Sequence, residues 1–214
     1  MRILVTGATG LIGSAVVARL IRAGHAVTAL SRRVATARRR QPEAEWVSVD
    51  VARHVTAEHW LPHLQGVDAV VNCAGALQDG PSDSLKGVHA VGIAALFAAC
   101  EQLGIRRVVH FSAIGVDRAT PTEFSRTKLE GDQALMARDL DWIILRPSVV
   151  LGRAAYGASA LMRALAALPV LPLMPNTGPL QVVQQSLFHQ IALLDTVSLG
   201  VAFDLLFGLF RNVG

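Results

Sequence analysis

A run of small residues near the amino terminus has the spacing of a phosphate-binding turn. Glycines stand first, fourth and last in the segment Gly7-Ala8-Thr9-Gly10-Leu11-Ile12-Gly13. The first glycine permits a tight turn, the second lets the backbone approach a pyrophosphate, and the third lets a helix pack closely on a strand. Because the N–H groups and the dipole at the start of a helix favour an anion, the segment predicts a dinucleotide-binding turn.

The residues after the second apolar run bear on which dinucleotide is preferred. A site for NAD usually has Asp or Glu there, which accepts hydrogen bonds from the ribose hydroxyls. This chain has Ser31, Arg32 and Arg33, and its first acidic residue is Glu43. Arginine pairs with a phosphate through parallel N–H groups, so the sequence favours NADP(H) over NAD(H). The alternative is that the two arginines are solvent-exposed residues that flank a helix and bind no ligand.

Short apolar runs that alternate with longer helical patterns must position these residues. The expected strands are 2–6, 26–30, 46–49, 69–72, 107–112 and 142–145, and the expected helices are 11–23, 88–103 and 122–138. Strands rich in Val, Ile and Leu that alternate with helices are typical of a parallel sheet covered on both faces. The predicted fold class is therefore α/β, a doubly wound parallel sheet of the Rossmann type.

The length of 214 residues predicts one domain. We expect residues 1–152 to form an NAD(P)-binding domain and residues 153–214 to add a substrate-side loop and an apolar helix that do not fold alone. Residues 153–214 are too few for a full substrate lobe. We therefore expect either a short variant of the fold or a truncated or frame-altered chain. Residues 187–210 are mostly apolar, but Asp195 and Asp204 oppose a membrane span. Docking on the domain or in a homodimer is favoured over membrane association.

Composition and charge exclude several classes of protein. Hydrophobic residues make up 52% and charged residues 17%, which excludes disorder as the main state. The two cysteines, Cys73 and Cys100, exclude a disulfide framework or a zinc site, so we expect no metal and a cytoplasmic location. The first 42 residues carry eight arginines and no acid, which indicates either an anionic partner or a solvated basic surface. Nucleic acid is not expected, because no aromatic residues are interleaved with the arginines.

Several motifs beyond the glycine turn resemble the short-chain dehydrogenase/reductase superfamily, in particular its extended and atypical branch of epimerase/dehydratase-like and NmrA-like proteins. They are TGATGLIG at 6–13, Asp50-Val51, Asn72-Cys73-Ala74-Gly75, VHFS at 109–112 and Arg146-Pro147-Ser148. The resemblance covers residues 1–183. It implies that Asp50 and Val51 contact the adenine, that Cys73, Ala74 and Gly75 line the cofactor, and that Lys128 holds the nicotinamide ribose. Ser112 and Pro147 complete the cofactor-binding set that it implies.

The chemistry of this superfamily usually depends on a Tyr-x-x-x-Lys pair on one helical face, in which the tyrosine transfers a proton. This chain has Phe124 and Lys128 at that spacing, and its single tyrosine is Tyr156. The catalytic residues that the resemblance leaves are Ser112 and Lys128, with Tyr156 as a substitute proton donor. His89 and His110 are further substitutes. We expect a helix-capping or surface role for the first and a core position for the second.

Two functions fit these observations. The first is an NADP(H)-dependent oxidoreductase of the atypical branch that acts on a carbonyl or quinone-like small molecule without the usual tyrosine. The second is a non-catalytic dinucleotide-binding protein that senses the NADPH/NADP balance or supports assembly of a complex with a protein partner. A weaker third is a membrane-surface protein that uses residues 187–210.

Overall fold

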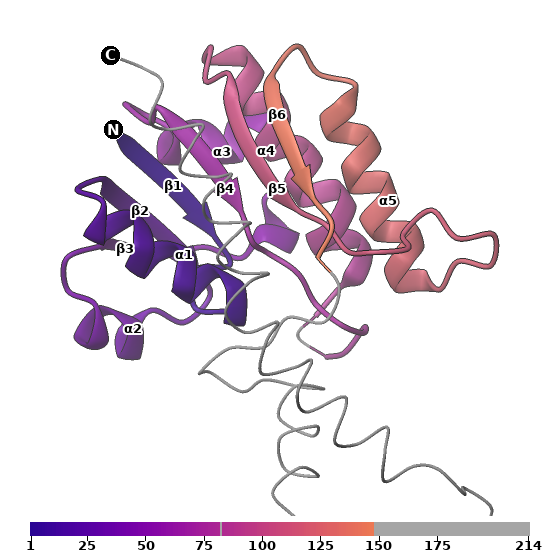
Figure 1. Ribbon diagram of the computed structural model, residues 1–214, viewed down its shortest axis with the longest axis horizontal. Coiled ribbons are helices and arrows are strands. Elements are labelled where there is room, and N and C mark those ends of the chain that lie inside the picture. Colours follow the sequence, from indigo (N-terminus) through magenta and orange to yellow (C-terminus); the bar gives the residue numbers. More distant parts are fainter. Residues whose placement is uncertain (82, 148–214) are drawn as a thin grey trace, which may run out of the picture. The chain divides into compact units, whose positions relative to one another are not determined.

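Six parallel strands form one sheet in the computed structural model, which describes residues 1–81 and 83–147 (Figure 1). The strands are β1 (Arg2–Thr6), β2 (Ala26–Ser31), β3 (Glu45–Ser48), β4 (Ala69–Asn72), β5 (Arg107–Phe111) and β6 (Asp141–Leu145). Their order across the sheet is β3-β2-β1-β4-β5-β6, and each neighbouring pair is parallel. The order reverses between β1 and β4, which is where doubly wound sheets bind their ligands. The predicted fold class is confirmed.

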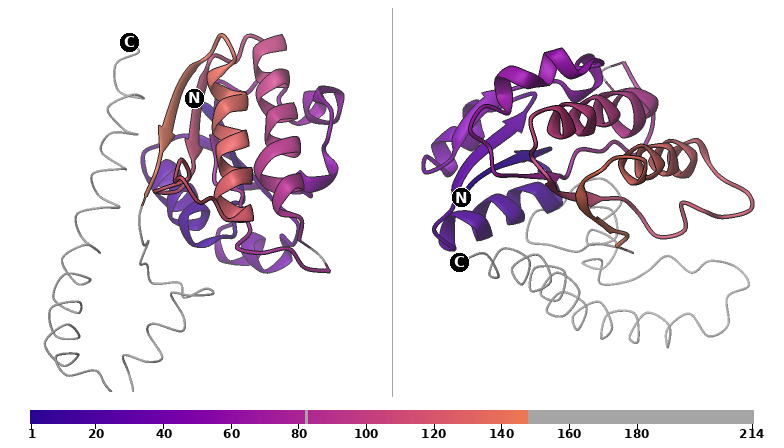
Figure 2. Two further views of the ribbon diagram at one scale, coloured as in Figure 1. Left: turned by 90° about the vertical axis from the view of Figure 1, so that its right-hand side faces the viewer. Right: turned by 90° about the horizontal axis from the view of Figure 1, so that it is seen from above.

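Helices cover both faces of this sheet. The α-helices are α1 (Leu11–Arg22), α2 (Ala35–Arg40), α3 (Ala57–Trp60), α4 (Gly92–Gln102) and α5 (Glu123–Met136). Three further short segments are the 3₁₀-helical η1 (Val51–Arg53) and η2 (Leu61–His63) and the π-helical η3 (Gly87–Val91). α1 lies on one face, and α4 and α5 lie side by side on the other (Figure 2). The amino end of α1 is thereby directed to the carboxyl end of β1.

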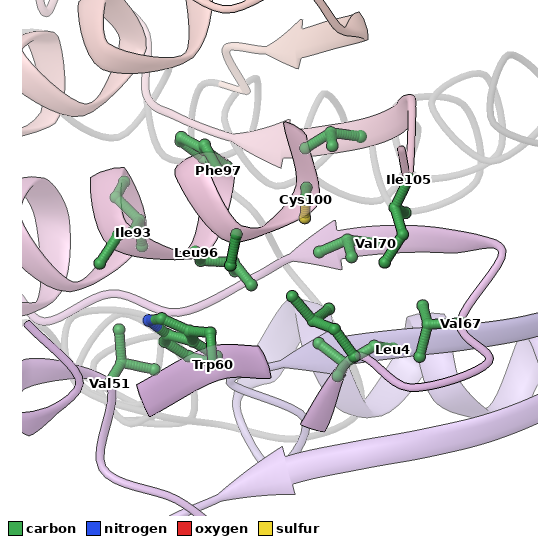
Figure 3. Close-up of a cluster of buried hydrophobic side chains, with 14 of the residues drawn as sticks. Leu4, Val51, Trp60, Val67, Val70, Ile93, Leu96, Phe97, Cys100 and Ile105 are labelled. Atoms are coloured by element: carbon green, nitrogen blue, oxygen red, sulfur yellow. The ribbon is translucent and has the colours of Figure 1, made fainter. Parts of the chain in front are cut away.

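The core on the α4 side of the sheet fixes the central strands. Leu4 and Val70 of neighbouring strands pack with Trp60, Leu96 and Phe97, and all five are fully buried (Figure 3). The Trp60 indole N–H donates to the backbone carbonyls of residues 54 and 92, at 3.0 and 3.1 Å. Because its polar atom is satisfied, this large side chain is buried at little cost.

The observed elements follow the predicted ones closely, apart from the start of the helix expected at 88–103 and the short helices α2, α3, η1 and η2, which were not predicted. β1 and β4 have the predicted bounds, and Gly24 ends the first helical region with φ at +82°. The helix expected at 88–103 begins instead as the π-helical η3. There Gly92 lies so close to the Val51 carbonyl that a Cβ would overlap it. α2 was not predicted, because its sequence ATARRR is exposed and has no apolar face.

Several expectations lie outside the described residues: the boundary at residue 152, the substrate-side segment 153–214, Tyr156 and the apolar stretch 187–210. Within residues 1–81 and 83–147, no helix has both the length and the apolar character that a membrane span requires.

Candidate cofactor-binding site

The turn between β1 and α1 depends on its glycines. Gly7 has φ at +60°, and a Cβ there would lie 2.5 Å from the Cys73 carbonyl oxygen. A Cβ on Gly13 would overlap the Gly7 carbonyl, so α1 and β1 approach each other closely only with glycine at 13. Gly10 is the N-cap of α1 and is exposed, and no side chain in the described part of the chain caps this helix. The first N–H groups of α1 therefore remain available to an anion.

A cavity of about 180 Å³ opens beside this turn, at the reversal of the strand order. Ten of the residues predicted to bind a cofactor line it: Gly7, Thr9, Gly10, Ser31, Arg32, Asp50, Val51, Cys73, Ala74 and Gly75. They come from the carboxyl ends of β1, β2, β3 and β4, four places far apart in the sequence. The structure thus brings most of the predicted dinucleotide site together at one place.

Other predicted residues do not line this cavity. Gly13 and Ala8 are buried behind the turn, and the Ala8 N–H donates to the Leu30 carbonyl at 3.0 Å. Leu11 and Ile12 belong to the first turn of α1. Arg33 is exposed next to Arg32 but is not among the described lining residues.

Seven further residues that were not predicted also line the cavity: Leu30, Val49, Ala52, Ala76, Asp83, Ser84 and Val88. Most of them neighbour predicted residues and follow from the strand ends. Asp83 is different, because it stands in the loop after β4 and forms an ion pair with Arg32, with a distance of 2.8 Å between Nη1 and Oδ1. No local signal in the sequence indicates this contact between residues so far apart.

Polar contacts hold the walls of the cavity in place. The Thr9 and Ser31 hydroxyls lie 2.6 Å apart and join the glycine turn to the end of β2. The Asp50 carboxylate accepts from the Ala52 N–H at 3.2 Å and so caps η1. The Asp50 carbonyl accepts from His54 Nδ1 at 3.0 Å. Backbone and side chain of Asp50 are therefore both fixed where the resemblance places the adenine.

Lys128 and Ser112, two further predicted residues, lie at the end of β5, and Lys128 also reaches Gly75. Lys128 of α5 is buried, and its Nζ donates to the Phe111 carbonyl at 2.9 Å, one residue before Ser112. Ser112 is also buried, and its N–H donates to the Leu145 carbonyl at 2.8 Å. A Cβ on Gly75 would stand 3.4 Å from Lys128 Nζ. Since Gly75 also lines the cavity, it connects the dinucleotide cavity with the predicted catalytic lysine.

Burial sets the charge of Lys128. Removal from water disfavours the ammonium form and lowers the pKa of Lys128 to about 8, although the carboxylate of Asp132 one helical turn later acts in the opposite direction. This amine therefore changes charge close to neutral pH.

His89 is fully buried, so the expected capping or surface role is wrong. Its Nε2 accepts from the Ala76 N–H at 3.0 Å, which places the proton of the neutral ring on Nδ1, 3.0 Å from Thr127 Oγ1. Burial and the nearby Lys128 ammonium lower the pKa of His89 to about 3. The imidazole is thus neutral, and it ties the loop after β4 to α5 rather than donating a proton.

His110 occupies the core, as expected, and belongs to a buried polar chain. Asn72 accepts from the Thr6 hydroxyl through Oδ1, so its Nδ2 donates to His110 Nδ1 at 2.8 Å. The His110 proton is then on Nε2, 3.2 Å from Asp132 Oδ1. Arg146 closes the chain, with its Nη2 2.9 Å from Asp132 Oδ2. Burial opposes ionisation of Asp132, but the His110 and Arg146 contacts outweigh it and lower the pKa of Asp132.

Pro147 is predicted to bind the cofactor but is not among the described residues that line the cavity. Pro147 follows β6, and its carbonyl accepts from the Ile114 N–H at 3.0 Å. Cys73 and Cys100 are free, and burial raises the pKa of both thiols, for Cys100 to about 12. Within residues 1–81 and 83–147, no group of three or more His, Cys, Asp or Glu side chains is arranged to hold a metal ion.

Comparison with known proteins identifies the family. A model of NAD(P)H-binding domains matches residues 7–164. The chain is 29% identical to the uncharacterized protein Rv2047c of Mycobacterium tuberculosis over 92% of its length and 20% of that protein's. It is 32% identical to 2-alkyl-3-oxoalkanoate reductase of Stenotrophomonas maltophilia, over 71% of this chain and 52% of the enzyme. It is 29% identical to the photosystem II assembly factor Ycf39 of Synechocystis, over 68% of this chain and 44% of that protein.

The fold agrees with these matches. The structure of WbmG of Bordetella bronchiseptica in complex with NAD superimposes with a TM-score of 0.63 at 23% identity, over 78% of this chain and 60% of that one. The chain spans from a fifth to about half the length of the curated relatives named above. With the glycine turn at the strand reversal and the cavity beside it, the chain belongs to the NAD(P)H-binding family whose model matches residues 7–164.

Proposed function

We propose that this chain binds NADP(H) in preference to NAD(H) and acts as an oxidoreductase that lacks the usual catalytic tyrosine. The observation that carries the cofactor preference is Arg32. It follows β2, where sites for NAD place an acid, and its side chain lines the cavity. A guanidinium there pairs with a 2′-phosphate, whereas the unphosphorylated ribose gains nothing from it.

The described residues fit a dinucleotide at both ends of the cavity. The glycine turn and the first N–H groups of α1 would hold the pyrophosphate, and Asp50 and Val51 would flank the adenine. Lys128, behind Gly75, would hold the nicotinamide ribose through its ammonium. The bound nicotinamide supplies the hydride, and this chain's residues bind it, orient it and shield it from water.

The missing tyrosine separates two versions of the function. A reductase also needs a proton for the substrate oxygen, and Phe124 cannot supply one. In our proposal Ser112, Lys128 or a water molecule serves instead, and turnover is slow. The reductase of Stenotrophomonas favours this catalytic version, with a carbonyl compound as substrate.

The second candidate is a non-catalytic dinucleotide-binding protein. Phe124 at the proton-donor position favours it, and so does the likeness to a protein whose name is that of an assembly factor. In this version the bound dinucleotide acts as a signal, and a protein partner takes the place of the substrate. Both versions suit a cytoplasmic protein with free thiols.

Titration calorimetry with NADPH and NADH tests the cofactor proposal. We expect NADPH to bind more tightly than NADH. Arg32→Ala should weaken the binding of NADPH and leave the binding of NADH nearly unchanged. Arg33→Ala is the matched control, because it removes the same charge one residue away from the cavity. Equal weakening by both variants would mean that only the overall basic charge matters. Assays of NADPH oxidation with aldehydes, ketones and quinones separate the two versions.

A further inference from the structure

Asp83 faces Arg32 across the candidate cofactor cavity, although 50 residues separate them in the sequence. Their side chains form an ion pair at 2.8 Å, and both residues line the cavity. The pair is partly accessible, with side-chain exposures of 46% for Arg32 and 37% for Asp83. The guanidinium expected to meet a cofactor phosphate is therefore already in contact with a carboxylate of this chain.

The loop after β4 holds Asp83 at this place. The Gly80 N–H donates to the Asp83 carbonyl at 2.9 Å, and the Asp83 N–H donates back to the Gly80 carbonyl at 3.2 Å. Asp79 Oδ1 accepts from the Leu85 N–H at 2.7 Å, and the Leu85 side chain is buried. Because these hydrogen bonds fix the backbone before and after Asp83, the loop holds its carboxylate at the cavity wall.

The position of Asp83 has opposite consequences for the two dinucleotides. A 2′-phosphate that approaches Arg32 must displace or lie beside a carboxylate, and like charges at this distance repel each other. A ribose without the phosphate carries a hydroxyl in its place, which donates a hydrogen bond to a carboxylate. Asp83 thus stands where it opposes NADP(H) and supplies the acceptor that the end of β2 lacks.

We propose that Asp83 is a specificity-determining residue, which limits the NADP(H) preference set by Arg32 and allows NAD(H) to bind as well. This inference rests on the proposed binding of NADP(H) at Arg32. It assigns the selection between the two cofactors to a pair of residues from different loops, rather than to the end of β2 alone.

The variant that tests this is Asp83→Asn, which keeps the size of the side chain and removes its charge. Exposed ion pairs are worth about 0.2–1 kcal/mol, so we expect NADPH to bind about 1.4- to fivefold more tightly. NADH should bind no more tightly than to the unmodified chain. The fragments 2′,5′-ADP and 5′-AMP should show the same contrast, which would locate the effect at the 2′-phosphate. The gain should shrink at high salt.

Asp139→Asn is the matched control. Asp139 is exposed and pairs with Arg106 at 3.1 Å, just before β5 and β6 begin and so at the edge of the sheet opposite the cavity. It makes the same change in net charge, and we expect no effect on either dinucleotide. If Asp139→Asn raises the affinity for NADPH as much as Asp83→Asn does, the change in net charge explains the gain and the inference is wrong.

The background variant Arg32→Ala completes the test. The gain from Asp83→Asn should shrink there to the part that comes from carboxylate–phosphate repulsion, because no guanidinium remains to be released. A gain that is as large without Arg32 as with it, or one that is equal for NADPH and NADH, contradicts the inference. If Arg32→Ala weakens NADPH and Asp83→Asn changes nothing, only the inference about Asp83 fails. If neither variant changes NADPH binding, the proposed placement of the 2′-phosphate at Arg32 fails as well.

Discussion

The ring of Phe124 packs against the imidazole of His89 in an edge-to-face arrangement, with ring centroids 5.3 Å apart and an angle of 88° between the ring planes. His89 Nε2 lies beside Gly75, the same residue that meets Lys128 Nζ. Phe124, one helical turn before Lys128, therefore contacts His89, whose Nε2 and the Lys128 Nζ both lie close to Gly75. A tyrosine at position 124 would thus carry its hydroxyl on the helix that bears Lys128, one turn before it.

Phe124→Tyr should raise reductase activity. The variant places an ionisable hydroxyl one turn before Lys128, and a nearby ammonium favours the phenolate, so the pKa of the new tyrosine should fall. We expect NADPH-dependent reduction of simple aldehydes, ketones or quinones to increase, by less than the ~10²–10⁴-fold of a fully placed general acid. Initial rates measured at saturating NADPH provide the test.

Phe124→Leu is the control for this gain, because it changes packing on His89 without adding a hydroxyl. A second control is Phe124→Tyr combined with Lys128→Met, which should lose the gain. If the unmodified chain already turns over as fast as Phe124→Tyr, another group supplies the proton.

Two glycines of the turn should respond differently to substitution. Gly10→Val should abolish dinucleotide binding and leave a folded domain, because a Cβ at Gly10 meets only the Gly7 carbonyl, at 3.2 Å, while the branched side chain occupies the pyrophosphate's path. Gly13→Ala should instead destabilise the fold by about 1–3 kcal/mol, since its Cβ overlaps backbone. Calorimetry with NADPH and urea unfolding measure the two effects. Undiminished binding by Gly10→Val would remove the glycine turn from the site.

The glycine turn could be predicted because its signals are local. The strand Arg2–Thr6, the spacing of glycines and the helix that follows lie within about twenty residues, and each supports the same structure. The order of the strands, and hence the meeting of Asp50 with Gly75, followed from the resemblance and from the rules of parallel sheets.

The residues that were missed or wrongly placed depend on contacts between distant segments. Asp83 lies in an exposed loop, whose sequence pattern says nothing of the path that carries it to Arg32. His89 lies where a regular helix start was expected, and the π-helical turn of η3 carries it into the core. There Gly131 of α5 approaches the His89 carbonyl so closely that a Cβ would overlap it, a packing detail that no periodicity shows.

NADPH affinity should depend on pH through Lys128. With a pKa near 8, the amine is charged below that pH and neutral above it. If the ammonium holds the nicotinamide ribose, affinity is highest below pH 8 and falls as the pH rises through 8. Calorimetry from pH 6.5 to 9.5 measures this, and Lys128→Arg, which stays charged, should flatten the profile. A profile that is flat in the unmodified chain would contradict the role of Lys128.

The same lysine makes a prediction for stability. Its pKa is lower in the folded chain than the ordinary value of 10.5, so between about pH 8 and 10.5 the unfolded state binds more protons. The free energy of unfolding should therefore rise with pH across this window, relative to a Lys128→Met variant that lacks the titrating group. Urea unfolding of both chains at several pH values compares them. A difference that stays constant with pH would mean that burial does not shift the pKa of Lys128.

Among the buried polar side chains that link Asn72 to Arg146, Asp132 should cause the largest loss of stability when it is removed. Its side chain is fully buried between His110 and Arg146, so Asp132→Ala leaves the Arg146 guanidinium without its buried acceptor and removes the carboxylate 3.2 Å from His110 Nε2. Removing one partner of a buried pair costs about 3–5 kcal/mol, and we expect a loss of this size in urea unfolding. Asp117→Asn is the matched control, since Asp117 contacts the same Arg146 at 3.3 Å but is exposed, and its loss should cost no more than about 1 kcal/mol. Asp132→Asn should fall between the two, because it keeps an acceptor for one neighbour. Equal losses of stability for Asp132→Ala and Asp117→Asn would show that the polar contacts linking Asn72, His110, Asp132 and Arg146 do not stabilise the fold.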